Sequence, residues 1–235
     1  FGWDAKDETL KPTDMEGRDG LSSWSWDVDA LIGGLGESYK IMECGMKAFP
    51  TEALTHTHLS CLLNAMIGNN LDYTDIQEVK VTCFAQAYDI LFDPTKYRPE
   101  SRETADHSLP YCMAAAMVDK KITTESFSDE KLNDPRIYEV IDKIKGEPSQ
   151  EFEKMFPAKQ PSKVVVTTND GREFSEYLEY PKGDPREPMT MDDLENKFNS
   201  LVGDKFDASS KSKLKENILN CEDKSANEFM ENLTI

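Results

Sequence analysis

Residues 102–119 read RETADHSLPYCMAAAMVD, and this stretch says more about the fold than any other part of the chain. Its second half, Ser108 to Val118, is dominated by small and apolar residues and predicts a helix. Because that helix is apolar all round, we expect it to lie in the centre of the core. Its first half places an arginine and an Asp-His pair at the start of the helix. We expect this polar cluster to face a small anionic ligand.

Helices and strands are expected to alternate on both sides of this stretch. Apolar spacing predicts a helix at 51–67, terminal glycines indicate a short helix at 28–35, and Asp134-Pro135 indicates the start of a helix at 136–144. Alternation predicts strands at 39–46 and, with β-branched residues, at 76–84. Residues 163–180 are the clearest hairpin, because the Asp-Gly step at 170–171 supplies the positive φ values that a tight turn requires.

The last part of the chain reads as helical. Residues 190–201 predict a helix with Thr190 as its N-cap, and residues 204–235 predict one or two amphipathic helices. We therefore expect an α+β protein with three parts. These are an extended lead-in at 1–20, a compact α/β domain at 21–185, and a C-terminal helical segment at 186–235 that packs on a partner domain.

Charge and hydropathy exclude several classes of partner. The chain carries 45 acidic and 27 basic residues, a formal net charge of −18, which argues against nucleic acid as a partner. Any anion site must then be locally basic, because the acidic body repels anions. No apolar run approaches the ~20 residues that span a bilayer, so we expect no direct membrane insertion.

The five cysteines lie far apart, with no C-x-x-C pair among them. Apolar or small neighbours suggest buried thiols, and an odd number of them is typical of a reducing compartment such as the cytoplasm or the mitochondrial matrix. Their spacing offers no local set of ligands for an iron–sulfur cluster.

Three segments in the same order carry a family resemblance: RETADHSLPY at 102–111, MKAFPTEALTH at 46–56 and YPKGDPREPMTMDDLENKF at 180–198. Together they resemble the MmgE/PrpD family of 2-methylcitrate dehydratases, to which cis-aconitate decarboxylases also belong. The resemblance implies a lid-like domain acting on a small tricarboxylate without a cluster or other cofactor. Members also contain a large helical N-terminal half, so it implies a second protein chain, or a larger assembly, that supplies the helical domain.

The candidate site residues follow from that chemistry. Dehydration of a tertiary-alcohol tricarboxylate needs a base, an acid, and cations that hold the carboxylates. The resemblance implies that Lys47 is the active-site lysine, that His56 is the histidine nine residues later, and that Tyr97 lies near a tyrosine used by decarboxylase relatives. Arg102 can hold a carboxylate with two parallel hydrogen bonds. We expect Lys47, His56 and His107 to be catalytic and Arg102 and Tyr97 to bind substrate.

Each candidate also has an ordinary explanation. Lys47 can be a surface lysine, and Arg102 can form a salt bridge with Glu103 or Asp106. The same Asp106 can orient the imidazole of His107 by fixing its tautomer, or it can cap the following helix. The two roles of this aspartate are compatible.

Two further features argue against other sites. His56 and His58 are two residues apart on the expected helix and point about 200° apart, so they cannot share a metal ion. We expect no metal site, and we expect His58 on the helix surface. Asp184 stands where the family often has a basic residue or a histidine, which argues against an anion role for the turn at 182–186.

Two functions remain open. In the first, the chain is the lid-domain half of a hydro-lyase of the 2-methylcitrate dehydratase type, inactive alone and completed by a separate chain. In the second, it is a non-catalytic structural subunit derived from this family within a larger, mitochondrial assembly. A stand-alone binding module for a carboxylate is the weakest alternative, because half a cleft binds weakly.

Overall fold

The structure is a computed structural model, and it describes residues 32–231 apart from the side chain of Asp204. The chain divides into two units, residues 1–43 and 44–235. The expected lead-in at 1–20, the boundary at 20/21 and most of the expected helix at 28–35 lie outside the described residues. In the first unit the described chain contains the short 3-10 helix η3 (Lys40–Glu43). The strand expected at 39–46 is therefore wrong: the alternating residues are exposed and pair with no strand.

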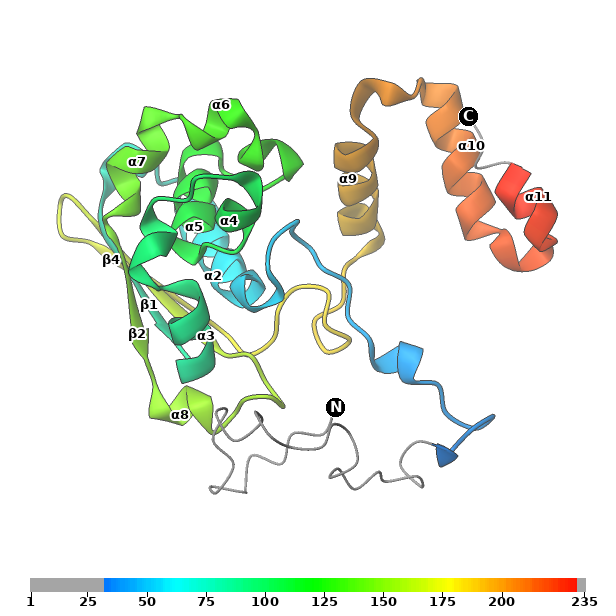
Figure 1. The fold of residues 1–235 in the computed structure, drawn as a ribbon, viewed down its shortest axis with the longest axis horizontal. Helices are drawn as coiled ribbons and strands as arrows, with labels where there is room; N and C mark the ends of the chain where they lie inside the picture. The colour runs from blue at the N-terminus through cyan, green and yellow to red at the C-terminus, as the bar shows by residue number, and fades with distance from the viewer. Residues whose placement is uncertain (1–31, 232–235) are drawn as a thin grey trace, which may run out of the picture. The chain divides into compact units, whose positions relative to one another are not determined.

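One mixed sheet organises the second unit (Figure 1). Its strands are β1 (Ile76–Cys83), β2 (Ile144–Pro148), β3 (Ser162–Thr168) and β4 (Glu173–Leu178). The order is β2-β1-β3-β4, with β1 and β2 parallel and the other two pairs antiparallel. The expected strand at 76–84 is confirmed, and so is the hairpin, whose turn places Gly171 at a φ of 83°.

The helix expected at 136–144 is shorter than its pattern indicates. Helix α7 (Pro135–Ile141) has Asp134 as its N-cap and Pro135 in the first turn, where the missing amide hydrogen costs nothing. Ile144 is already in β2, where it lies opposite Val79 of β1. The parallel pairing of β2 was missed because nothing local indicates it.

Helices α2 (His56–Gly68) and α5 (Leu109–Asp119) cover one face of the sheet. Both were expected; α2 begins later than the pattern predicts, after a 3-10 turn at Ala53–Thr55. The N-cap of α5 is Ser108, whose Oγ accepts a hydrogen bond from the amide of Tyr111 at 3.0 Å. The smaller helices are α3 (Ala85–Leu91), α4 (Arg102–Asp106), α6 (Asp129–Leu132) and α8 (Gln150–Glu153). Further 3-10 turns span Tyr73–Asp75, Pro94–Tyr97, Thr124–Phe127, Gly203–Lys205 and Cys221–Asp223.

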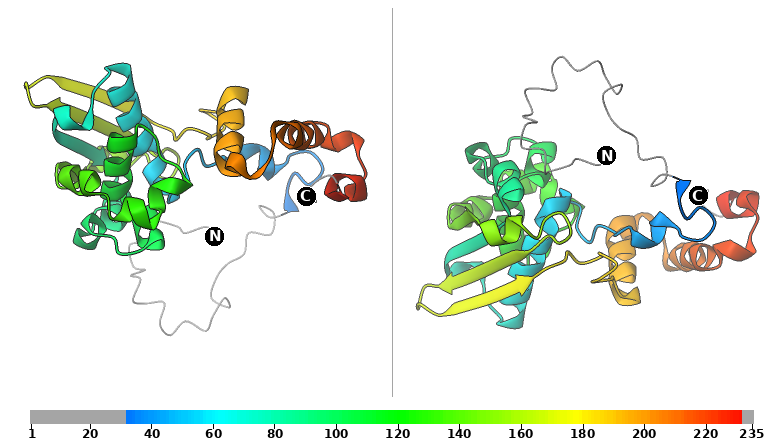
Figure 2. Two further views of the ribbon diagram at one scale, coloured as in Figure 1. Left: turned by 90° about the horizontal axis from the view of Figure 1, so that it is seen from above. Right: turned by 90° about the horizontal axis from the view of Figure 1, so that it is seen from below.

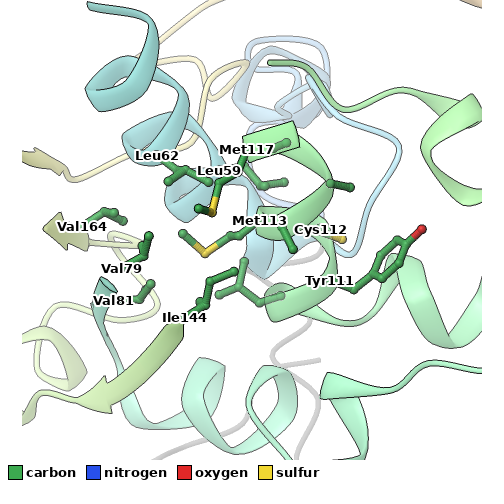
Figure 3. Packing of buried hydrophobic residues seen from close by; sticks show 14 of the residues in the cluster. Leu59, Leu62, Val79, Val81, Tyr111, Cys112, Met113, Met117, Ile144 and Val164 are labelled. Carbon is green, nitrogen blue, oxygen red and sulfur yellow. The ribbon is translucent and has the colours of Figure 1, made fainter. Parts of the chain in front are cut away.

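Side chains of α2, α5 and the strands meet in the core shown in Figure 3. Leu59 and Leu62 from α2 and Met113 and Met117 from α5 are fully buried against the strands. The strand residues that meet them are Val79, Val81, Ile144 and Val164. Alternate residues of a strand point to the same face, so the valines of β1 and β3 form one apolar surface. The alanines at 114–116 are also fully buried, as expected for a central helix packed closely on its neighbours.

The C-terminal helical segment is confirmed. It consists of α9 (Met191–Val202), α10 (Ala208–Leu219) and α11 (Ala226–Glu231). Thr190 and Asp193 form a capping box at the start of α9, and α10 and α11 lie side by side (Figure 2). No residue of α9 is buried. The protein is thus α+β with a helical C-terminal segment. None of the helices within residues 32–231 has the length and apolar character needed to cross a bilayer.

Candidate active site

The segment that carries Lys47 is held by a close backbone crossing. The amide of Met46 donates a hydrogen bond to the carbonyl oxygen of Gly183 at 2.8 Å. Gly183 has a φ of 95°, and a Cβ atom there would lie 1.9 Å from the carbonyl oxygen of Met46. Only glycine fits this conformation and this approach. The turn after the hairpin therefore fixes where the backbone of residues 45–47 runs.

Lys47 and His56 meet at one carbonyl group. The Nζ atom of Lys47 donates to the carbonyl oxygen of Thr51 at 2.9 Å, and the Nε2 atom of His56 lies 3.5 Å from that same oxygen. Phe49 stands edge-on to the imidazole, with ring centroids 5.5 Å apart. The structure therefore brings together two of the expected catalytic residues.

His56 is buried and neutral at physiological pH. It is 2% exposed, and this burial lowers its pKa to about 4, because a charged imidazole loses its hydration there. The hydrogen bond to Thr51 opposes the shift, whereas the positive charges of Lys47 and Lys197 reinforce it. A neutral imidazole beside a lysine ammonium can hydrogen-bond a ligand or accept a proton from it.

Lys197 was missed by sequence reasoning. Its Nζ atom donates to the carbonyl oxygen of Lys47 at 2.5 Å, so α9 supplies a second ammonium group to the same segment. The two lysines are 150 residues apart in the chain, and no local pattern connects them. Only the fold of the C-terminal segment could have identified it.

The Asp-His pair lies beside the segment that carries His56. The amide of Glu52 donates to the carbonyl oxygen of Asp106 at 3.0 Å, which links the 3-10 turn before α2 to the end of α4. The Nδ1 atom of His107 contacts Oδ1 of Asp106 and also lies 3.1 Å from the carbonyl oxygen of Glu103. This carboxylate therefore orients the imidazole. The expectation that it caps the next helix is wrong, because Ser108 holds that position.

Within residues 32–231, no side-chain hydrogen bond or ion pair joins Arg102 or Tyr97 to Lys47, His56 or the Asp106–His107 pair. The hydroxyl of Tyr97 donates to the carbonyl oxygen of Ile144 in β2 at 2.9 Å and so fixes the loop before α4. Arg102 is exposed in the first turn of α4, and no ion pair joins it to Glu103 or Asp106 among the described residues.

The position expected for His58 is wrong. It is fully buried instead of lying on the helix surface, and its Nδ1 atom is 2.6 Å from Oγ of Ser162 in β3. Burial lowers its pKa to about 3, so it is neutral. Because His56 faces Thr51 while His58 faces β3, the two imidazoles have separate surroundings.

The cations of the turn at 182–186 are engaged within the protein. Arg186 pairs with Asp184 at 2.8 Å and lies over the ring of Tyr180, with its guanidinium carbon 4.0 Å from the centroid. Lys182 pairs with Asp193 of α9 at 3.0 Å. These side chains hold the turn in place for Gly183.

Cys61, Cys83 and Cys112 are buried thiols. Burial raises the pKa of Cys61 and of Cys83 to about 12, so both remain protonated.

Comparisons with known proteins identify the family of the chain. Residues 49–223 match the model of the MmgE/PrpD C-terminal domain. The chain is 31% identical to a cis-aconitate decarboxylase of Mus musculus over 102 residues, which cover 43% of this chain and 21% of the relative. It is 23% identical to one of Aspergillus terreus over 188 residues, covering 77% and 38% of the two chains. The human cis-aconitate decarboxylase is 31% identical over 108 residues, or 43% and 21%.

The matches to these relatives thus cover between about a fifth and two fifths of their length. The matched domain covers most of the present chain and contains His56, the Asp106–His107 pair and Lys197, with Lys47 two residues before it. The chain therefore belongs to the MmgE/PrpD family.

Proposed function

We propose that the loop 47–56 binds a carboxylate of a small tricarboxylate, as part of a hydro-lyase of the 2-methylcitrate dehydratase type that uses no cluster. The observation that carries this proposal is the meeting of the Lys47 ammonium and the neutral His56 imidazole at the carbonyl of Thr51. One Nζ hydrogen of the lysine is used there, which leaves two for a ligand. In a protein of net charge −18, such a locally basic site is what an anion requires.

Each residue has a role in this proposal. Lys47 holds a substrate carboxylate and stabilises the charge that develops on it when the neighbouring carbon loses a proton. A bound carboxylate near His56 raises the pKa of that imidazole, since it offsets the charges of the nearby lysines. His56 can then exchange a proton with the substrate, and the Asp106–His107 pair is a second acid–base group. Arg102 and Tyr97 remain proposed substrate contacts.

A helical domain on a separate chain completes the cleft in this proposal and contributes the main base. The exposed apolar side chains of the C-terminal segment support this part, because each loses unfavourable contact with water when a partner covers it. They are Met191 and Leu201 of α9 and Ile218 and Leu219 of α10. The buried thiols of Cys61, Cys83 and Cys112 support a reducing compartment, the cytoplasm or the mitochondrial matrix.

The test is to identify the chains that co-purify with this one and to assay the complex. We expect elimination of water from 2-methylcitrate, and Lys47→Ala should abolish most of it. The relatives are named cis-aconitate decarboxylases, so release of carbon dioxide from cis-aconitate is the matched second assay. If the complex decarboxylates cis-aconitate but does not dehydrate 2-methylcitrate, the proposed tricarboxylate site stands and the proposed reaction changes to decarboxylation.

The alternative is a non-catalytic structural subunit within a larger assembly. One observation favours it: Tyr97, an expected substrate contact, uses its hydroxyl to hold β2. A purified assembly that contains this chain, lacks both activities and is unaffected by Lys47→Ala would establish this alternative.

A further inference from the structure

Lys197 is bound to the same loop as Lys47, and its position is specific. The Nζ atom of Lys47 is anchored on the carbonyl of Thr51, and the Nζ atom of Lys197 is anchored on the carbonyl of Lys47 itself. The two anchoring carbonyls are four residues apart in one short loop. Each ammonium therefore has a fixed place beside residues 47–51 and two hydrogens left for other acceptors.

Two of the three acidic side chains of α9 pair with lysines other than Lys197. Asp193 pairs with Lys182 at 3.0 Å and Glu195 pairs with Lys215 at 2.7 Å. Within residues 32–231, neither Lys47 nor Lys197 forms an ion pair with a carboxylate. Two ammonium groups thus contact one loop without an ion-pair partner among the described residues, in a chain where acidic residues greatly outnumber basic ones.

The positive charges of Lys47 and Lys197 both act on the His56 imidazole. Lys47 and Lys197 each lower its pKa, which places both ammonium groups close enough to act on the same imidazole. Like charges held together repel one another, and a ligand with two negative groups relieves that repulsion better than a ligand with one. The arrangement therefore favours a polycarboxylate over a monocarboxylate.

We propose that Lys197 is the second cation of the carboxylate site and selects ligands that carry at least two carboxylates. Lys47 holds one carboxylate of the ligand and Lys197 holds another. This inference rests on the proposed function of the loop 47–56. It adds a residue of the C-terminal segment to the site and gives α9 a part in recognising the ligand.

The experiment is a binding titration of the chain in complex with the partner that completes the cleft, followed through the NMR signals of the His56 ring at constant ionic strength. Citrate is the probe with three carboxylates and acetate the probe with one. The variants are Lys197→Ala, Lys197→Gln, Lys197→Arg and Lys47→Ala. Lys215→Ala is the control, because this lysine contacts the same helix but pairs with Glu195.

We expect Lys197→Ala to weaken citrate binding about 10-fold, the effect of losing one hydrogen bond to a charged group, and to leave acetate binding unchanged. Lys197→Gln keeps a hydrogen-bond donor for the carbonyl of Lys47 but lacks the charge, so it should weaken citrate binding as much as the alanine variant does. Lys197→Arg should retain most of the affinity, and Lys215→Ala should resemble the unmodified chain. The glutamine variant also keeps the test valid if the alanine variant does not fold.

Three outcomes would overturn the inference. If the Lys197 variants weaken the binding of citrate and acetate equally, or change the binding of neither ligand, Lys197 only holds α9 on the loop. If Lys47→Ala weakens the binding of both ligands while the Lys197 variants weaken neither, the proposed function stands and Lys197 is not part of the site. If the unmodified complex binds no citrate, or if its Lys47→Ala variant binds citrate equally well, the proposed function fails together with this inference.

Discussion

The amide of Met46 donates a hydrogen bond to the carbonyl of Gly183, and the carbonyl oxygen of Met46 lies 1.9 Å from the place that a Cβ of residue 183 would occupy. This crossing joins the loop of the candidate site to the turn between the sheet and α9. The same turn leads into the helix that carries Lys197. One backbone contact therefore sets the positions of both lysines relative to His56.

Replacing Gly183 with alanine should destabilise the protein and disturb the site. The new Cβ would lie 1.9 Å from the carbonyl oxygen of Met46, at a φ of 95°. Strain and clash together should lower the free energy of unfolding by at least about 3 kcal/mol. Urea denaturation measures this loss.

Gly171→Ala is the matched control for that substitution. Gly171 has a φ of 83°, but a Cβ added there would meet no atom within 4 Å, so only conformational strain applies. We expect a loss of about 1 kcal/mol there, with no change in the NMR signals of His56. Equal losses from the two variants would show that the crossing at Met46 can relax.

Lys47→Ala should lower dehydration of 2-methylcitrate by the completed complex about 100-fold or more, the scale of losing a positioned electrostatic group. The same variant should raise the pKa of His56, because one of the charges that lower it is removed. Lys163→Ala, an exposed lysine of β3, is the control in both measurements. A loss of activity with an unchanged His56 titration would place Lys47 away from this imidazole.

Local patterns in the sequence predicted much of the fold. The hairpin was predicted because its turn chemistry and its strands are contiguous, and α5 because an apolar run after Ser108 leaves little alternative. Strand β2 was missed because its partner β1 lies more than 60 residues earlier and the segment contains both a glycine and a proline. Residues 39–46 alternate like a strand, but alternation cannot supply a neighbouring strand to pair with.

For the candidate site, too, local sequence indicates some of the residues and only the tertiary fold identifies others. Lys47 and His56 lie in one segment, so their meeting at Thr51 is a local event that a spacing can indicate. Lys197 comes from a helix that begins 144 residues after Lys47, and only the tertiary fold brings it there. His58 was misplaced because α2 packs against strands on one side and α5 on another, which leaves little exposed surface on its first turns.

Stability should fall as the pH decreases from 6.5. The folded-state pKa values of His56 and His58, about 4 and about 3, lie below the unfolded value of 6.5. The unfolded chain therefore binds protons that the folded chain does not, and the stability that these neutral histidines contribute above pH 6.5 is lost as the pH falls toward 4 and 3. The free energy of unfolding should fall with decreasing pH by a slope that approaches about 1.4 kcal/mol per pH unit for each histidine.

His58→Asn isolates one of these two contributions. Asparagine can still hydrogen-bond Ser162 but does not titrate, so the variant should lose about half of the slope between pH 5 and 6.5. Urea denaturation at several pH values measures the difference. Asn199→Ala, at an exposed position without a titratable side chain, should keep the full slope. A variant at position 58 with an unchanged slope would mean that His58 titrates normally in the folded protein.

The isolated chain should self-associate through its C-terminal helices. Leu201 of α9 is 52% exposed, and Leu219 of α10 is 62% exposed. Covering exposed apolar side chains with a second surface stabilises the contact by a free energy of about 25 cal/mol for each Å² of apolar surface removed from water. Without a helical partner, the available surface is another copy of the same chain, and this contact should depend on concentration.

Leu201→Gln tests that expectation, because it removes apolar surface from a residue that is not part of the core. Sedimentation velocity over a range of concentrations should show less association than for the unmodified chain. Tyr177→Gln is the control, since Tyr177 is 44% exposed on β4, away from these helices in the sequence. A partner that restores activity should suppress self-association of the unmodified chain, because it would cover the same apolar residues. A monodisperse monomer at every concentration would mean that α9 to α11 need no cover, and the proposal of a completing helical domain would lose its support from this surface.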